Sequence, residues 1–381
     1  MRYRYDVNRT GIVYVAITLL VGVAAIIRPN NMLVWVFGLM LTLIAVGGLV
    51  SGAALYRMSL RRLDPSHGRV GRPMVVRYAV RSGSRRMPLF DVSLRELAGT
   101  EAGDWSTFSG PEAAWLMHAA PGETAHAESV LVPMRRGRLR FGRFEASSSF
   151  PFGLLRKSVQ VEQPMETLVY PRTVPLAARS IERLLGTGGE GDRPGRSLGS
   201  FGEFAGVREY LPGDSLRSIA WKRWIHDERP VVVQRSLPAP RRMILVVDLR
   251  RPTSDLRVAD GVDPRDAEER AITLAASLAE SALDLGVEVG LRLPGTDLTE
   301  LPMRGGRRHL DRLLSHLAAI ELDRPRTAPP PAVPAPTAAS LVVIHPDRVD
   351  TSIGHDAAWH LLPSSLDELG AAPADLRGAV A

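Results

Sequence analysis

The sequence predicts a membrane-anchored protein of several domains: two transmembrane helices, then an all-β sandwich, then an α/β domain with a parallel sheet. Three observations predict this. Residues 11–27 and 32–56 contain no charged side chain, and only a short polar turn separates them. Between residues 64 and 175, apolar and polar residues alternate with the period of two that is typical of strands. From residue 241 onward, continuous apolar runs alternate with segments of helical spacing, which indicates an α/β fold.

The composition excludes several classes of chemistry. The chain of 381 residues carries 48 Lys and Arg against 41 Asp and Glu, a net charge of +7, and contains no cysteine. Disulfides, thiolate metal sites and cysteine nucleophiles are therefore ruled out. The arginines are scattered among acidic residues and are not accompanied by a base-stacking aromatic motif, so we expect no nucleic-acid partner.

The first element is a two-helix hairpin at residues 11–56, preceded by a short N-terminus at residues 1–10. At 1.5 Å per residue the two uncharged segments reach roughly 25 and 37 Å, against a hydrocarbon core of about 30 Å. A secretory signal peptide would have a shorter apolar region and no second span. Neither span contains an ionisable residue, so the pattern favours an anchor in the lipid bilayer over an ion path.

The arginines around the hairpin predict its orientation. The turn between the spans holds Arg28 alone, whereas the outer ends carry Arg2, Arg4, Arg9, Arg57, Arg61 and Arg62. By the positive-inside rule, residues 1–10 and everything after Arg57 face the cytoplasm. We therefore expect a multi-pass protein of the cell membrane whose soluble domains are cytoplasmic.

A β-sandwich is predicted for residues 64–175. Alternating residues at 74–80 and 90–95, and extended segments at 128–132, 138–144 and 167–170, are separated by Gly and Pro. With no long amphipathic helix in this region, two packed antiparallel sheets are the natural way to bury one face of each strand. The run from Ser149 to Leu154 is interpreted as a tight apolar turn packed on the sandwich.

Residues 176–200 are rich in glycine and are predicted to form a flexible loop. Gly186 to Gly191 formally match G-x-G-x-x-G. No apolar strand leads into this run and no helix follows it, so a dinucleotide-binding loop is rejected.

The α/β domain is predicted at residues 241–381. Met243–Val247 has the continuous apolar character of a central parallel strand. The following helix has Asp263 as its N-cap and Pro264 in its first turn, and Gly286 ends it. A strand at 287–293, a helix at 310–320 and a strand at 341–344 continue the alternation of a doubly wound, Rossmann-type sheet. Residues 324–339 form a Pro- and Ala-rich insert.

Asp248 is the first residue to consider as a site, because ligands of such sheets bind at the carboxyl ends of the strands. A nucleotide hydrolase would need a phosphate-binding loop upstream, and the sequence has none. A magnesium site would need further oxygen ligands nearby, but Arg250 and Arg251 follow instead. The pattern favours a structural role for Asp248, either as an ion pair with one of these arginines or as a cap.

The segment 201–240 contains the densest mixture of polar and aromatic residues in the chain. Its distinctive residues are Glu203, Phe204, Arg208, Tyr210, Gly213, Asp214, Arg217 and Trp221. Together with Arg136-Gly137-Arg138, Pro151-Phe152-Gly153-Leu154 and Tyr170-Pro171, this signature closely resembles the bacterial family called domain of unknown function 58.

The resemblance implies a von Willebrand factor A-like domain at residues 241–381 and a partner among the MoxR-type AAA+ ATPases. Many such A-like domains carry a metal site of the form Asp-x-Ser-x-Ser. Here Asp248 is present, but Arg250 and Pro252 stand at the two serine positions. Phe150 also stands where relatives tend to have Asp. The first departure argues against a metal, so no cofactor is predicted and Mg²⁺ is disfavoured.

These observations predict a non-enzymatic interaction or adaptor protein that presents its A-like domain to a cytoplasmic partner. The signature residues would form either the partner-docking surface or a structural clasp between domains. A metal-dependent ligand-binding A-like module is the alternative, and an unrecognised hydrolase is the third possibility. No zinc-protease, nucleophile-elbow or kinase motif is present in the sequence.

Overall fold

The computed structural model describes residues 2–28, 30–56, 58–84, 87–97, 113–186, 194–199, 203–211, 216, 219–221, 230–238, 241–258, 261–326, 339–353 and 358–370. The chain divides into two compact units, Met1–Pro171 and Arg172–Ala381. This division lies close to the predicted end of the β region at residue 175.

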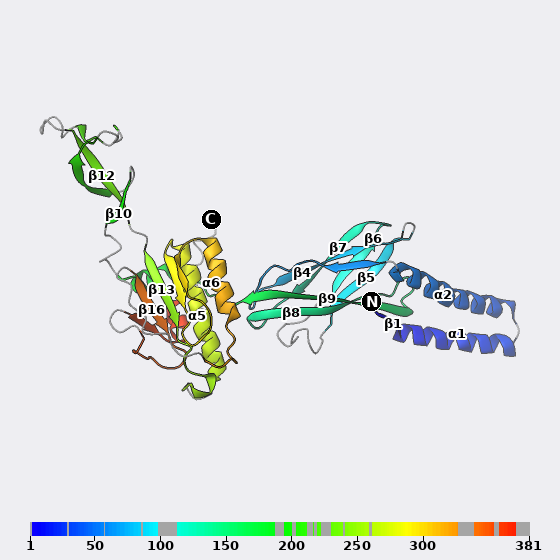
Figure 1. The fold of residues 1–381 in the computed structure, drawn as a ribbon. Helices are drawn as coiled ribbons and strands as arrows, with labels where there is room; N and C mark the ends of the chain where they lie inside the picture. The colour runs from blue at the N-terminus through cyan, green and yellow to red at the C-terminus, as the bar shows by residue number, and fades with distance from the viewer. Residues whose placement is uncertain are drawn as a thin grey trace. The chain divides into compact units, whose positions relative to one another are not determined.

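The hairpin of the first unit consists of α1 (Arg9–Ile27) and α2 (Asn31–Tyr56), which lie side by side (Figure 1). Both helices are long and apolar enough to span a membrane. The ring of Phe37 packs so closely on Gly22 that a Cβ there would lie 2.7 Å from it. Large apolar side chains such as Ile26 and Trp35 remain about four-fifths exposed, so the protein itself does not cover the hairpin's outer surface.

The rest of the first unit is built from two sheets that enclose one core. One sheet has the order β1-β9-β8-β5-β6, with β3 beside β9, and the other has the order β2-β4-β7. Val76, Tyr78, Leu94 and Phe144 are fully buried between them. The strands are β1 (Arg2–Val7), β2 (Ser59–Arg62), β3 (Gly68–Arg69), β4 (Met74–Arg81), β5 (Leu89–Glu96), β6 (Ala114–Ala119), β7 (Thr124–Leu131), β8 (Gly137–Ser148) and β9 (Leu155–Tyr170).

The N-terminus, for which the sequence predicts no secondary structure, contains a strand. Strand β1 pairs antiparallel with β9, in a register that runs from Arg2 opposite Gln160 to Val7 opposite Leu155. The first four residues of β1 alternate Arg and Tyr, which is compatible with a strand, but this stretch is too short to stand out in the sequence. Strand β1, which directly precedes the hairpin, therefore belongs to the same sheet as β8 and β9, which follow the hairpin in the sequence.

A buried ion pair lies inside this core. Arg62 and Glu96 make two parallel hydrogen bonds of 2.7 Å, and both side chains are at most 1% exposed. The Tyr78 hydroxyl donates to Glu96, and the Arg62 guanidinium also donates to the Gln163 carbonyl. Burial, followed by the neighbouring Glu96 charge, raises the pKa of Tyr78.

The second unit contains a sheet of order β15-β14-β13-β16-β17. Strand β13 is parallel to β14 on one side and to β16 on the other, β17 is parallel to β16, and β15 is antiparallel to β14. This places β13 at the centre, as its apolar run predicts. The strands are β13 (Arg242–Val247), β14 (Glu288–Arg292), β15 (Leu301–Arg304), β16 (Ser340–Ile344) and β17 (Ala358–Leu361).

The principal helix is α5 (Pro264–Asp284), which begins and ends where the sequence predicts. The Asp263 carboxylate accepts a hydrogen bond from the Arg265 amide as the N-cap. After the last turn, Gly286 adopts a φ of +76°, which favours glycine. Helix α5 packs on β13 and β14, and α3 (Ala178–Leu184) and α6 (Arg307–Ala319) pack on α5.

The other face of the sheet is covered differently from the predicted doubly wound arrangement. There Ile244 and Val246 of β13 and Leu341 and Val343 of β16 pack against Met303 and Ile353. In the described part of the second unit, α5 packs on the sheet, and α3 and α6 pack on α5. These three helices therefore belong to the α5 side of the sheet. The short α7 (Ser365–Leu369) and the 3-10 turn η3 (Thr253–Asp255) complete the described helical elements.

The segment predicted as a loop at 176–200 is more ordered than expected. It begins with α3 and ends with β10 (Pro194–Gly199), which joins β11 (Glu203–Glu209) and β12 (Val231–Pro238) in a sheet of order β10-β12-β11. Ile181 and Leu184 are buried, which explains why residues 178–184 fold as a helix. Most of the G-x-G-x-x-G match lies outside the described residues.

Candidate functional site

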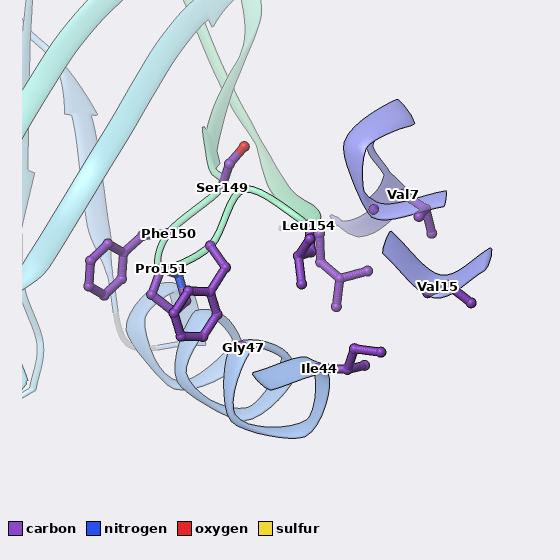
Figure 2. Close-up of a pocket in the computed structure, with 11 residues that line it drawn as sticks. Val7, Val15, Ile44, Gly47, Ser149, Phe150, Pro151 and Leu154 are labelled. Carbon is purple, nitrogen blue, oxygen red and sulfur yellow. The ribbon is translucent and has the colours of Figure 1, made fainter. Parts of the chain in front are cut away.

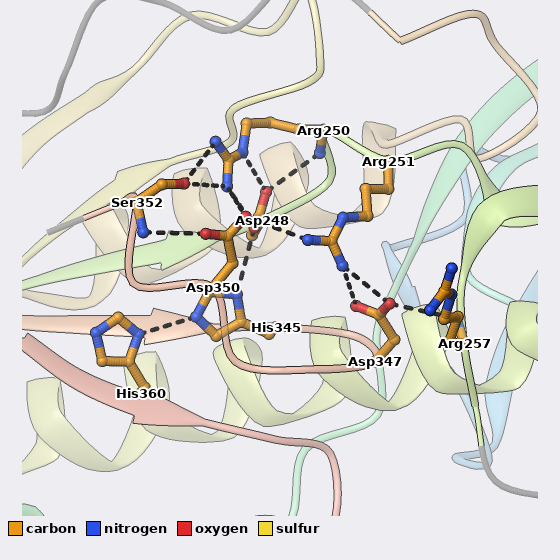
Figure 3. A network of polar contacts seen from close by, with 9 residues as sticks. All are labelled: Asp248, Arg250, Arg251, Arg257, His345, Asp347, Asp350, Ser352 and His360. Carbon is orange, nitrogen blue, oxygen red and sulfur yellow. Dashed lines mark hydrogen bonds and ion pairs between the residues drawn. The ribbon is translucent and has the colours of Figure 1, made fainter.

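A polar cluster lies at the carboxyl edge of the parallel sheet. Asp248 follows β13, His345 follows β16, and Asp347, Asp350 and Ser352 lie in the loop after β16 (Figure 3). Adjacent parallel strands end at the same edge of a sheet, so two segments about a hundred residues apart in sequence meet here. We call these residues, with Arg250, Arg251 and His360, the edge cluster.

Arg250 is the centre of the edge cluster. Its Nε donates to Asp248 Oδ1 at 2.9 Å and its Nη2 donates to Asp248 Oδ2 at 3.1 Å. The same Nη2 lies 3.0 Å from Asp350 Oδ2, and Ser352 Oγ lies 3.3 Å away. The ion pair predicted between Asp248 and a following arginine is therefore present, and it extends to a second carboxylate that the sequence did not indicate.

Arg251 neutralises the outer part of the cluster. It bridges Asp347 at 3.1 Å and Asp350 at 3.2 Å. Asp347 also accepts a hydrogen bond from the Arg257 amide. Each of the three aspartates thus faces at least one guanidinium.

The surroundings of Asp248 and Asp350 favour the charged form of these two carboxyl groups. Burial by itself would raise the pKa of Asp248, but hydrogen bonds from His345 and Arg250 and the Arg250 charge bring it well below its usual range. Hydrogen bonds from Ser352 lower the pKa of Asp350.

A chain of two histidines leads away from Asp248. His345 Nδ1 lies 3.3 Å from Asp248 Oδ2, and its Nε2 lies 2.9 Å from His360 Nδ1. Because a carboxylate only accepts hydrogen bonds, a neutral His345 donates from Nδ1 and accepts from His360. Burial, followed by the charge of His345, lowers the pKa of His360. His345 stands at a strand end in the sequence, but no spacing pattern connects it to His360.

The edge cluster does not fit a divalent metal. Mg²⁺ requires several oxygen ligands at about 2.0–2.1 Å around one point. Between Asp248 and Asp350 that space holds the Arg250 guanidinium. No group of three or more His, Asp or Glu side chains arranged to hold a metal ion occurs among the residues that the structure describes.

The signature residues that the structure describes lie on the two sides of strand β12. Arg208 of β11 lies opposite Val232 of β12, and Ile219 bridges the same Val232 from the side of β10. Since neighbouring strands lie about 4.8 Å apart, Arg208 and the Ile219–Trp221 segment flank β12 at roughly twice that separation. Tyr210 continues the β11 pairing through its amide, which donates to the Pro230 carbonyl at 2.9 Å.

For two of the other signature residues the structure gives the strand pairing, and the remaining three lie outside the described residues. Glu203 and Phe204 pair with Ser236 and Arg235 at the start of β11. Gly213, Asp214 and Arg217 lie outside the described residues.

Several large apolar side chains of the signature segment are exposed. Leu211 is 60% exposed, Leu216 64% and Trp221 52%. Interfaces concentrate aromatic and apolar anchors of this kind together with Arg. We call Arg208, Tyr210, Leu211, Leu216 and Trp221 the signature face.

A hollow lies in the first unit, where the loop Ser149–Leu154 meets the hairpin (Figure 2). It has an empty volume of about 370 Å³ and is lined by apolar groups that include Val15, Ile44 and Leu154. The Phe150 ring stacks on Phe90 with a centroid distance of 4.7 Å, which fixes the loop to the sheet. The predicted apolar turn is therefore present, and it contacts the helices as well as the sandwich.

Comparison with known proteins finds a family model that matches the middle of the chain. Residues 206–343 match the family described as "Protein of unknown function DUF58". The resemblance predicted from the signature is thereby confirmed over this range, which includes most of β11 and the sheet as far as β16.

One curated relative is "Uncharacterized protein YeaD" of Bacillus subtilis (strain 168). It is 26% identical over 200 residues, which cover 52% of this chain and 46% of that protein. The chain thus matches about half the length of this relative.

Two solved structures resemble parts of the chain only weakly. A conjugative transposon lipoprotein from Bacteroides eggerthii DSM 20697 is 7% identical with a TM-score of 0.17, over 29% of this chain and 97% of that one. A beta-glucosidase from Kluyveromyces marxianus is 13% identical with a TM-score of 0.14, over 29% of this chain and 15% of that one. Scores this low support no conclusion about fold or function.

Proposed function

We propose that this protein is a membrane-anchored adaptor that holds a cytoplasmic partner, a MoxR-type AAA+ ATPase, at the membrane through the signature face. The identity of the partner comes from the family resemblance of the signature. The A-like character of the second unit is part of the same proposal, supported by a central parallel strand that ends in Asp248 and is followed by α5.

The attachment of the hairpin to the sandwich supports the anchoring half of this proposal. The Asn8 side chain donates to the Gly153 carbonyl at 2.9 Å, and the Asn8 amide donates to Leu154. On α2, the Gly48 carbonyl accepts from Lys157 Nζ at 2.7 Å. Both outer ends of the hairpin are therefore tied to one folded domain, which requires them to lie on the same side of a bilayer.

The exposed signature face is the observation that carries the docking half. Trp221 and Arg208 belong to the residue types that dominate binding energy at interfaces. Trp221 and Leu216 are more than half exposed, as the anchors of a docking surface are before a partner binds.

The proposal is tested by crosslinking and affinity purification of the full-length protein from its native membrane. Wild type should recover an AAA+ ATPase, and an Arg208→Ala, Trp221→Ala variant should recover at least tenfold less, as loss of a tryptophan or arginine anchor costs about 2 kcal/mol or more. The matched control is Trp115→Ala, Met117→Ala on β6, where the side chains are 67% and 80% exposed but lie outside the signature.

The outcomes separate the two halves of the proposal. Equal recovery by all three proteins would place the docking surface elsewhere and assign the signature to a structural role. Recovery of no ATPase under conditions that preserve membrane complexes would contradict the adaptor function itself.

A further inference from the structure

The edge cluster holds a positive charge at the position where the family resemblance implies a metal ion. Arg250 stands at the first serine position of Asp-x-Ser-x-Ser, and its guanidinium lies between Asp248 and Asp350. We propose that Arg250 is the resident cation of this edge, so that the second unit is completed by a guanidinium of its own chain and uses no divalent metal there.

The geometry of the contact is that of a dedicated ion pair. Two nitrogens of Arg250 engage the two oxygens of Asp248 in the fork-to-carboxylate arrangement that a planar guanidinium favours. The Arg250 amide also donates to Asp248 Oδ1 at 3.3 Å. Arg250 is only two residues from Asp248 in the sequence. The contact between its guanidinium and the Asp248 carboxylate therefore closes only a very short loop, at a small cost in chain entropy.

Burial makes this positive charge necessary. The Asp248 side chain is 8% exposed and the Asp347 side chain 3%. Three carboxylates gather at this edge against two guanidinium groups and one ring N–H of His345. Removing Arg250 leaves Asp248 with His345 as its remaining side-chain partner and Asp350 with Arg251, and an uncompensated buried charge is strongly destabilising.

The bound guanidinium also excludes a metal by occupancy. Its Nη2 contacts Asp248 Oδ2 at 3.1 Å and Asp350 Oδ2 at 3.0 Å, which are the two oxygens that a shared ion would need. A divalent cation could reach them only after Arg250 had left, and the second position of the metal motif, Pro252, offers no hydroxyl to replace it.

Thermal unfolding of the full-length protein in detergent tests the proposal by chemical rescue. Wild type should unfold at the same temperature in EDTA, Mg²⁺ or Mn²⁺. Arg250→Ala should unfold roughly 5 °C lower or more, and millimolar guanidinium should restore much of the loss, whereas MgCl₂ of equal ionic strength should not. Arg250→Lys should be intermediate, because an ammonium cannot make the paired contact.

Arg324→Ala is the matched control, because Arg324 also bridges two carboxylates but is 58% exposed. It should show little loss and no rescue. The proposal is overturned if Arg250→Ala loses no more stability than Arg324→Ala, or if Mg²⁺ or Mn²⁺ stabilises wild type but not Asp248→Asn. If Arg250→Ala does not fold, Mn²⁺ titration of wild type followed by electron paramagnetic resonance decides: free Mn²⁺ throughout supports the proposal and bound Mn²⁺ refutes it.

Discussion

At the scale of single residues, each of the two units contains a buried arginine that pairs with a buried glutamate. In the sandwich, Arg62 is fully buried and pairs with Glu96, and its guanidinium lies 5.0 Å from the centre of the Phe141 ring and 5.1 Å from that of Phe144. In the second unit, Arg326 pairs with Glu268, whose side chain is also fully buried. Burial raises the pKa of Glu268, against the lowering effect of its hydrogen bond from Thr253. Both pairs have their carboxylate partner fixed by a further hydroxyl donor, Tyr78 or Thr253.

The Arg62 pair yields a prediction about stability. Glu96→Ala leaves the Arg62 charge buried without its partner and should lower the free energy of unfolding by about 3–5 kcal/mol. The matched control is Glu166→Ala, because Glu166 pairs with Arg140 at the same 2.7 Å but both side chains are more than half exposed. That change should cost less than about 1 kcal/mol. Denaturant unfolding of the full-length protein measures both, and equal losses would contradict the assignment of Arg62 and Glu96 as a buried structural pair.

At the scale of elements, the contact between hairpin and sandwich depends on a glycine. A Cβ at Gly11 of α1 would lie 2.1 Å from the Leu154 carbonyl oxygen, which is backbone and cannot move aside easily. Gly11→Ala should therefore separate α1 from the loop Ser149–Leu154 and lower stability by about 1–3 kcal/mol. We expect faster proteolysis of this loop in the variant.

Gly38 supplies the control for this prediction. It lies in α2, and a Cβ there would meet nothing within 4 Å. Gly38→Ala should leave both the unfolding temperature and the proteolysis rate of the loop unchanged. If Gly11→Ala behaves like Gly38→Ala, the close contact between α1 and Leu154 does not hold the hairpin to the sandwich.

The elements that the sequence predicts correctly are those with a strong local pattern. Each of these patterns lies within one short segment of the chain. They are the N-cap at Asp263, the apolar run of the strand Met243–Val247, and the two uncharged helices. Strands β1 and β6 are not predicted, because they are stabilised by pairing with β9 and β5 and not by a strong local pattern. Their existence depends on tertiary contacts, which a sequence pattern does not contain.

The same distinction applies to the candidate site. Asp248 and Arg250 are two residues apart, so their pairing can be predicted from the sequence. Asp350 and His360 reach the edge cluster from about one hundred residues away, through the parallel pairing of β13, β16 and β17. The separation of Arg208 from Trp221 by β12 likewise follows from strand order and not from the spacing of the signature.

At the scale of the whole molecule, the two apolar helices are attached to a folded domain at both outer ends. The pairing of β1 with β9 places strands that precede and follow the hairpin in one sheet. Combined with two spans and with arginines concentrated outside the turn, this arrangement predicts that both units face the cytoplasm. Docking of a cytoplasmic ATPase requires that orientation, so the orientation is the central claim.

Single-cysteine labelling of intact cells tests this claim most directly, because the chain has no native cysteine to interfere. Cysteines are introduced one at a time at the exposed positions Asn31, Thr124 and Arg307, in the hairpin turn, the sandwich and the second unit. A membrane-impermeant maleimide should label Asn31→Cys in intact cells, and Thr124→Cys and Arg307→Cys only after permeabilisation. Labelling of Thr124→Cys or Arg307→Cys in intact cells, with Asn31→Cys protected, would reverse the orientation and contradict the account.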